Sequence, residues 1–354
     1  MSVGERIKTA RVMVGMSQRQ LAEMAGVSAM AISKYEHDQD VPGSAVLLRL
    51  GRALRVKVEY FFRPFNVRLS APAYRRRQSL PDQQRESIVA RVQEWVERYI
   101  EIEGLLNLEE RADLPPSYPV RSFEDAEEAA RSLREYWKIG EDPIEGLLDL
   151  LEDRGIKVGL VDGPEAFDAL TLWANETLPI IAIKRGMTGD RQRFCLAHEL
   201  GHLVMEIDDG IDDKGVEKLA HRFAAAFLVP APAVKAELGE RRQRLDLYEL
   251  HLLKHKYGLS MQAWIFRAKD QDILSEQASG RLFREFSRKG WRKVEPGDQL
   301  QAEEPQRFKR LVVRALTEDM ISDSRASEIL GTPLAQFWQE EAERHGGLPL
   351  AARH

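Results

Sequence analysis

Apolar residues recur at helical spacing through most of this 354-residue chain. In residues 5–64 they form short runs separated by tight turns, which predicts a bundle of short helices. A longer amphipathic run covers residues 83–107, and further helical patterns follow around 124–137 and 143–153. The positions that share one face of the longer run are Ile88, Val92, Trp95, Tyr99, Ile102 and Leu106. The chain is therefore predicted to be mostly α-helical.

Short runs of β type interrupt this pattern in the middle of the chain, at 156–161, 168–173 and 179–184. Because they are brief and closely spaced, they predict a small β-sheet. The run 179–184, PIIAIK, is a candidate edge strand to which a peptide substrate adds. Helices are expected again from near Asp190, over 214–228, and through most of 241–342.

Residues 17–38, SQRQLAEMAGVSAMAISKYEHD, have the pattern of a helix-turn-helix. Ser17 and Ser28 are suited to cap two successive helices, and Gly26 permits the tight turn between them. The outward face of the second helix is expected to meet base edges in the major groove of DNA. That face carries Ala29, Met30, Ser33 and Lys34, while Gln18 and Arg19 are placed to touch phosphates.

From about residue 5 to residue 63 the chain resembles the XRE (Cro/cI-type) repressor family, through LAEMAGVS, IS.YE, VP and LLRLGRAL in that order. Glu36 and Pro42 stand where that family keeps a structural glutamate and a loop proline. The resemblance implies binding to double-stranded operator DNA. Ala29 and Met30 are apolar where family members often carry polar readers, so base readout is expected to depend on Ser33, Lys34 and contacts with thymine methyl groups.

The segment CLAHELGHLVME, residues 195–206, contains two histidines four positions apart with a glutamate after the first. On a helix, His198 and His202 share a face and can bind one Zn²⁺ ion. Glu199 lies beside that face and is the candidate general base for peptide hydrolysis. A third ligand is needed, and the next helix offers Glu217 and His221, again four apart on one face. An ordinary buried helix with two histidines is the alternative.

Around this motif the chain resembles the ImmA/IrrE metallopeptidase family over about residues 125–270. The resemblance rests on LREYWKIGEDPIEGLLDLLEDRGIKV, FDALTLW, PIIAIKRGMTGDRQRFCLAHELGHLVME and EKLAHRFAAAFLVP, in that order. It implies a zincin-like fold, His198, His202 and Glu217 as zinc ligands, and Glu199 as catalyst. The family usually has asparagine four residues after the third ligand, where this chain has His221, which leaves His221 as a second choice of ligand. Two imidazoles and one carboxylate also suit Mn²⁺.

Charge and cysteine content indicate which partners the protein binds and in which compartment it works. Residues 1–100 contain 17 Lys and Arg against 10 Asp and Glu, although the whole chain has a net charge of −5. The excess of basic residues in this N-terminal part is consistent with contact to nucleic acid. The lone cysteine, Cys195, excludes an internal disulfide framework and fits a reducing cytoplasm. With neither a signal-peptide pattern nor an apolar run long enough to span a membrane, we expect a cytoplasmic protein.

We expect four segments: an all-α DNA-binding bundle at 1–65, a linker with the long helix at 66–120, an α+β zincin-like peptidase domain at 121–275, and a helical extension at 276–354. The long helix either forms a homodimer interface or packs on its own peptidase domain.

The expected function is that of a transcription regulator that cleaves a repressor-type protein, or cleaves itself within the basic linker YRRRQSLPD (74–82). The alternative is an antitoxin-like or sensor regulator that binds a toxin-like partner or a metal without hydrolysis.

Overall fold

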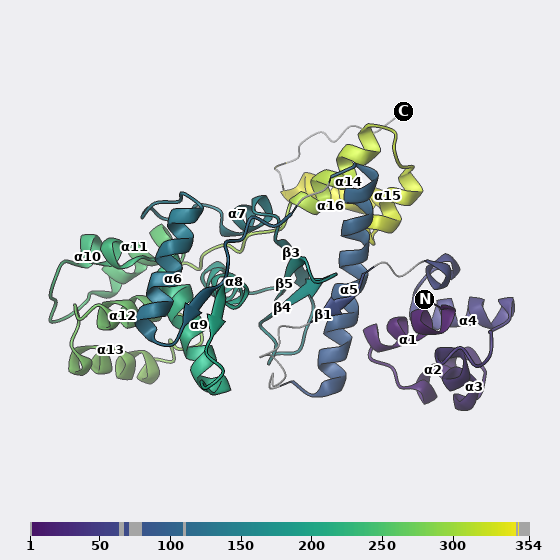
Figure 1. Ribbon diagram of the computed structural model, residues 1–354, viewed down its shortest axis with the longest axis horizontal. Helices are drawn as coiled ribbons and strands as arrows, with labels where there is room; N and C mark the ends of the chain where they lie inside the picture. The colour runs from purple at the N-terminus through teal and green to yellow at the C-terminus, as the bar shows by residue number, and fades with distance from the viewer. Residues whose placement is uncertain (1, 64–66, 71–79, 109–110, 345, 347–354) are drawn as a thin grey trace. The chain divides into compact units, whose positions relative to one another are not determined.

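The computed structural model describes residues 2–63, 67–70, 80–108, 111–344 and 346 (Figure 1). The chain divides into two compact units, each assembled from segments distant in sequence. Unit 1 comprises Met1–Leu69, Leu80–Glu110 and Gln306–His354, and unit 2 comprises Ser70–Ser79 and Arg111–Pro305. Most of the basic linker 74–82 lies outside the described residues. The four-segment division made from the sequence stays a prediction.

The described part of unit 1 has helices as its regular structure except at Leu69, the first residue of the two-residue strand β1 (Leu69–Ser70). Its front part is a bundle of short helices, and a long helix and a C-terminal group of helices complete it. In chain order the elements are α1 (Val3–Met13), α2 (Gln18–Ala25), α3 (Ala29–Glu36), α4 (Ser44–Leu54), the 3₁₀ helix η1 (Val58–Phe62), α5 (Asp82–Leu105), α14 (Arg307–Thr317), α15 (Asp323–Leu330) and α16 (Leu334–Arg344).

The caps expected for the helix-turn-helix are present. The Ser17 hydroxyl accepts from the backbone N–H of Gln20, whose side chain in turn accepts from the backbone N–H of Ser17. Gly26 ends α2 with a φ of 63°, a conformation that costs glycine little, and Ser28 caps α3 through the N–H of Ala31. These local bonds fix the turn that sets α3 against α2.

A buried charge network ties α1, α2 and α3 together. Arg11 on α1 donates from Nε to Glu36 Oε1 over 2.5 Å and from Nη2 to Glu36 Oε2 over 2.9 Å. Gln18 on α2 donates to the same carboxylate over 2.7 Å. The Glu36 side chain is 1% exposed, so its charge depends on these donors for compensation. Glu36 therefore acts as a structural link between three helices.

Replacing Glu36 by alanine is expected to destabilise the N-terminal bundle by roughly 3 kcal/mol, because Arg11 is then left as a partly buried charge without its partner. Amide hydrogen exchange of α1–α4 in the full chain should then quicken by about 100-fold. Glu23→Ala, a change at an exposed position of α2, is the matched control and should leave exchange unchanged. Equal exchange in both variants would contradict a structural role for Glu36.

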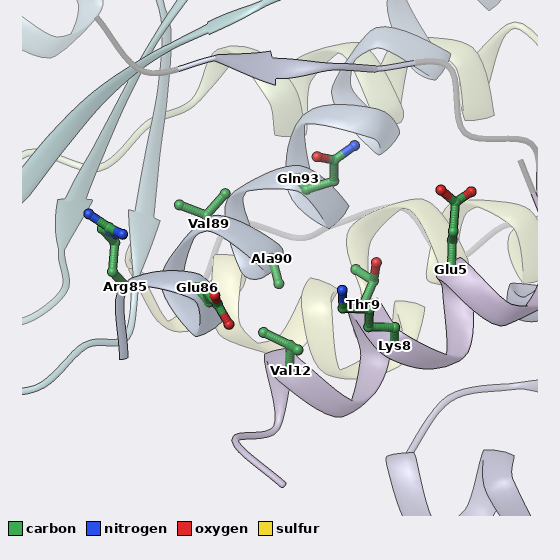
Figure 2. Close-up of a pocket in the computed structure, with 9 residues that line it drawn as sticks. All are labelled: Glu5, Lys8, Thr9, Val12, Arg85, Glu86, Val89, Ala90 and Gln93. Atoms are coloured by element: carbon green, nitrogen blue, oxygen red, sulfur yellow. The ribbon is translucent and has the colours of Figure 1, made fainter. Parts of the chain in front are cut away.

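The long helix α5 buries its apolar face inside unit 1. Tyr99 and Ile102 pack with apolar residues of α14 and α15, and the rings of Tyr99 and Phe308 stack with centroids 5.2 Å apart. Closer to its N-terminus α5 lies beside α1. A cavity of about 440 Å³ lies between these two helices, with charged and apolar side chains from both along its walls (Figure 2).

Unit 2 combines helices with two small sheets. In chain order its elements are β2 (Tyr118–Val120), α6 (Phe123–Tyr136), α7 (Leu147–Asp153), β3 (Lys157–Val161), β4 (Ala169–Ala174), β5 (Leu178–Lys184), α8 (Gly189–Val204), β6 (Met205–Ile207), α9 (Asp213–Leu228), α10 (Ala231–Leu238), α11 (Leu247–Tyr257), α12 (Met261–Asp270) and α13 (Glu276–Arg288). The mostly helical fold with a small mixed sheet confirms the predicted fold class.

Strand β5 is central in its sheet, with β4 antiparallel on one side and β3 parallel on the other. The prediction that residues 179–184 form an edge strand is therefore wrong. Five consecutive residues of β5, from Pro179 to Ile183, are buried, which is typical of a strand covered on both faces and paired on both sides. A peptide cannot add to β5, because its backbone groups already bond to its neighbours.

Helix α8 runs through the core of unit 2, packed against β4, β5, α7 and α9. Gly201 allows its close contact with α9: a Cβ atom there would lie 2.8 Å from Phe223 Cδ1. Strand β6 follows α8 without a break and pairs in parallel with β2. The polar residues of α8 are thereby held at a fixed place between the sheet and α9.

Among the described residues no helix is both long and apolar enough to cross a membrane.

Candidate metal centre and DNA-reading helix

The structure brings His198, His202 and Glu217 together. Their donor atoms all lie within 4.8 Å of one another. The two Nε2 atoms are 3.1 Å apart, and Glu217 places Oε2 3.1 Å from His198 Nε2 and Oε1 3.6 Å from His202 Nε2. The histidines come from successive turns of α8, and the glutamate comes from the second turn of α9.

These separations fit a divalent cation. Four-coordinate zinc with bonds of about 2.1 Å places neighbouring donor atoms about 3.4 Å apart, which is close to the observed spacing. Both histidines are buried, whereas the Glu217 side chain is 52% exposed. The group is therefore covered by protein on the α8 side and open on the Glu217 side, as a site that admits both a cation and a substrate requires.

The charges at the group also suit a cation. Hydrogen bonds and charge from His198 and His202 hold the pKa of the Glu217 carboxyl far below its usual range, which favours its anionic form. The sequence left Glu217 and His221 as alternatives for the third donor. His221 is not among the three residues whose donor atoms converge; its ring lies against that of His198, with centroids 4.8 Å apart, and stacks on Phe194. Burial and the nearby His198 lower the pKa of His221 to about 4.

Glu199 follows His198 on α8, and its side chain is buried. It is 3% exposed, and its Oε2 accepts a hydrogen bond of 2.5 Å from the hydroxyl of Thr171 on β4. This threonine was overlooked in the sequence, where it reads as one position in an apolar strand. The one available signal was a hydroxyl residue at a position where the strand pattern calls for an apolar side chain.

Buried ion pairs anchor the first turn of α8. Lys254 lies 3.2 Å from Asp190 and 3.1 Å from Glu295, with its own side chain 0% exposed. Arg193, one turn closer to the histidines, donates to Glu303 and to the backbone oxygen of Ile144. These contacts hold α8 in place at the end of the helix that precedes His198 and His202.

Cys195 packs against the apolar core next to these residues. Burial, together with the carboxylates of Asp168 and Glu199, raises the pKa of its thiol to about 12. A thiol in this environment stays protonated and is a poor metal ligand. Its environment is that of a small, partly buried apolar side chain rather than of a reactive thiol.

The outward face of α3 carries the residues expected to read DNA. Met30 and Lys34 are exposed, while Ala29 and Ser33 are half-buried at the edge of the front bundle. Arg19 is exposed at the start of α2. The side-chain nitrogen of Gln18 already bonds to Glu36, so a phosphate contact through that atom requires this bond to break. The assignment of these six residues to DNA stays a prediction.

Comparison with known protein families gives two matches. Residues 7–61 match the family described as helix-turn-helix, and residues 151–269 match the family described as IrrE N-terminal-like domain, a peptidase family. The first match covers the capped helices α2 and α3. The second covers the group His198, His202 and Glu217 together with β3, β4 and β5.

Curated relatives resemble the front of the chain. Uncharacterized HTH-type transcriptional regulators of Sinorhizobium medicae and Rhizobium meliloti are each 40% identical over 60 residues, which is 17% of this chain and 43% of each relative. A similar regulator of Sinorhizobium fredii is 38% identical over 60 residues. The chain thus spans less than half the length of these relatives.

The two family matches and the sites just described lead to one conclusion: this chain joins an XRE-type helix-turn-helix DNA-binding domain to an IrrE N-terminal-like peptidase domain.

Proposed function

We propose that the protein is a transcription regulator that binds operator DNA through α3 and hydrolyses a repressor-type protein at a divalent metal centre formed by His198, His202 and Glu217. The observation that carries this proposal is the convergence of two buried imidazoles and one carboxylate within 4.8 Å, with both imidazoles on the helix that also carries Glu199. Zn²⁺ is the metal we propose, with Mn²⁺ as the alternative for the same donors.

Each residue of the site has a role in this scheme. His198, His202 and Glu217 hold the cation, which when bound polarises the scissile carbonyl and acidifies water. Glu199 accepts a proton from the attacking water and passes it to the nitrogen of the departing amine, so one water adds across one peptide bond. The buried surroundings of Glu199 exclude bulk water, which strengthens its electrostatic interactions during the reaction.

The proposed substrate follows from the other half of the chain. A peptidase joined to a DNA-binding domain is brought close to proteins bound at the same operator, which raises their effective concentration. Repressors bound there are the first candidates. Cleavage within the chain's own linker, residues 74–82, is the second route to the same outcome.

The test uses the full chain loaded with Zn²⁺ and incubated with each repressor encoded by neighbouring genes. Mass spectrometry of the products should find new chain ends in one of these proteins or in the linker, and EDTA should suppress them. Intact proteins throughout, from a chain that holds zinc, would favour the alternative of a sensor or antitoxin-like regulator that binds its partner without hydrolysis.

For the DNA-binding part, Lys34→Ala is expected to weaken binding to the preferred operator by roughly tenfold, since a direct contact with a base edge contributes about 1–3 kcal/mol. The operator is first selected from random duplexes with the wild-type protein, and affinities are then measured by fluorescence anisotropy at fixed salt. Lys293→Ala removes an exposed lysine from unit 2 and serves as the control. Equal affinity of both variants and wild type would remove Lys34 from the reading face.

A further inference from the structure

We propose that Thr171 is a positioning residue that orients the Glu199 carboxylate for proton transfer. This inference rests on the proposed function. It adds a residue of the sheet, outside the helix that carries His198, Glu199 and His202, to the machinery of the site.

The geometry supports a specific contact. The Thr171 hydroxyl donates to Glu199 Oε2 over 2.5 Å. The hydroxyl oxygen, Thr171 Oγ1, also lies 3.3 Å from the backbone carbonyl oxygen of Glu199. Thr171 is 1% exposed and Glu199 is 3% exposed, so both groups are removed from water. A bond from a neutral hydroxyl to a charged oxygen is shorter and stronger than one between two neutral groups.

The neighbours of Thr171 show that packing alone does not account for a hydroxyl at this position. Leu170 and Leu172 on either side are buried and apolar. The cross-strand partner of Thr171 is Ile181 on β5, another buried apolar residue. Valine has nearly the same shape as threonine, fits a strand equally well, and avoids the cost of burying a hydroxyl. The contact with Glu199 offsets that cost.

The chemical consequence follows from the rotamers of glutamate. A glutamate that must accept a proton from a water at one fixed point has to hold its carboxylate plane within narrow limits. The first torsions of Glu199 are limited by its place on α8, but its terminal torsion is broad. The Thr171 hydroxyl fixes that last torsion, and it does so from β4, an element that the sheet holds in place.

The probe for this role is acetohydroxamic acid, which binds a catalytic cation through its two oxygens and donates a hydrogen bond to a carboxylate placed beside that cation. Its dissociation constant is measured by calorimetry on full-length protein loaded with Zn²⁺. The variants are Thr171→Val, which keeps the shape, and Thr171→Ser, which keeps the hydroxyl. Thr188→Val is the control, because Thr188 is exposed and its side chain makes no cap hydrogen bond to α8.

Thr171→Val is expected to bind the hydroxamate about tenfold more weakly, in line with other residues that orient the groups of a metal site. Thr171→Ser and Thr188→Val should bind it as wild type does, and zinc affinity should be equal in all four proteins. In a Glu199→Ala background, Thr171→Val should have no further effect, because the residue that it orients is gone.

Three results would overturn the inference. The first is equal hydroxamate affinity of Thr171→Val and wild type, and the second is an equal loss in the valine and serine variants, which would assign the effect to packing. A tenfold loss that persists in the Glu199→Ala background would also overturn it. Failure of the wild-type chain to hold zinc is a different outcome, because it would overturn the proposed function itself and this inference with it.

Discussion

His198→Ala is expected to lower the affinity of the protein for Zn²⁺ by two to three orders of magnitude. Structural zinc sites with four ligands bind by about 10–16 kcal/mol, so a single ligand accounts for about 3–4 kcal/mol, or roughly 100- to 1000-fold. Alanine also leaves a cavity at a buried position, but the remaining donors, His202 and Glu217, still face one another 3.6 Å apart. Competition with a chelator of known zinc affinity measures the change.

The chain contains a matched control for this experiment. His251 and His255 also lie four residues apart on one helix, α11, and their ring centroids are 4.6 Å apart, as are those of His198 and His202. Within the described part of the chain, no third donor converges with them. His255→Ala should therefore leave zinc affinity unchanged. Equal effects of the two alanine variants would remove His198 from the metal site.

Glu199→Gln is expected to reduce the rate of peptide hydrolysis by a factor of about 10² to 10⁴, the usual contribution of a general base. The amide oxygen of glutamine can still accept the hydrogen bond from Thr171, so the fold around the site should be preserved. Glutamine cannot take up a proton, and the step that needs a base is therefore lost. The measurement is the rate of substrate loss at saturating Zn²⁺.

Two further properties of this variant separate chemistry from structure. Its zinc affinity should match that of wild type, since Glu199 is not one of the three converging donors. The control Glu206→Gln makes the same chemical change at an exposed position of β6 and should leave the rate unchanged. A Glu199→Gln protein that cuts at the wild-type rate would assign the proton transfer to another group.

Sequence patterns predicted the elements of unit 2 well because each depends on local spacing. The runs 156–161, 168–173 and 179–184 correspond to β3, β4 and β5, and the helix expected from near Asp190 is α8. Local spacing could not predict the order of the strands in the sheet, because that order depends on pairing between distant segments. Composition alone does not distinguish the central position of β5 from an edge.

The residues of the candidate site were also predictable only where they depend on local spacing. The spacing of His198 and His202 fixes their common face on a helix, whereas Glu217 and His221 share a face of the next helix equally well. Only the packing of α9 on α8 distinguishes them, and it brings Glu217 to the histidines while His221 stacks on Phe194. Thr171 lies 28 residues before its partner Glu199, and no local pattern links the two.

The most direct test of the central claim compares wild type with Glu199→Gln, both carrying equal zinc, during incubation with repressors from neighbouring genes. Mass spectrometry then searches for new chain ends in those proteins and in residues 74–82 of the chain itself. We expect defined cleavage by wild type and by Glu206→Gln, and intact proteins with Glu199→Gln. Cleavage of equal extent by all three would contradict hydrolysis at this site, and so would no cleavage by any of them.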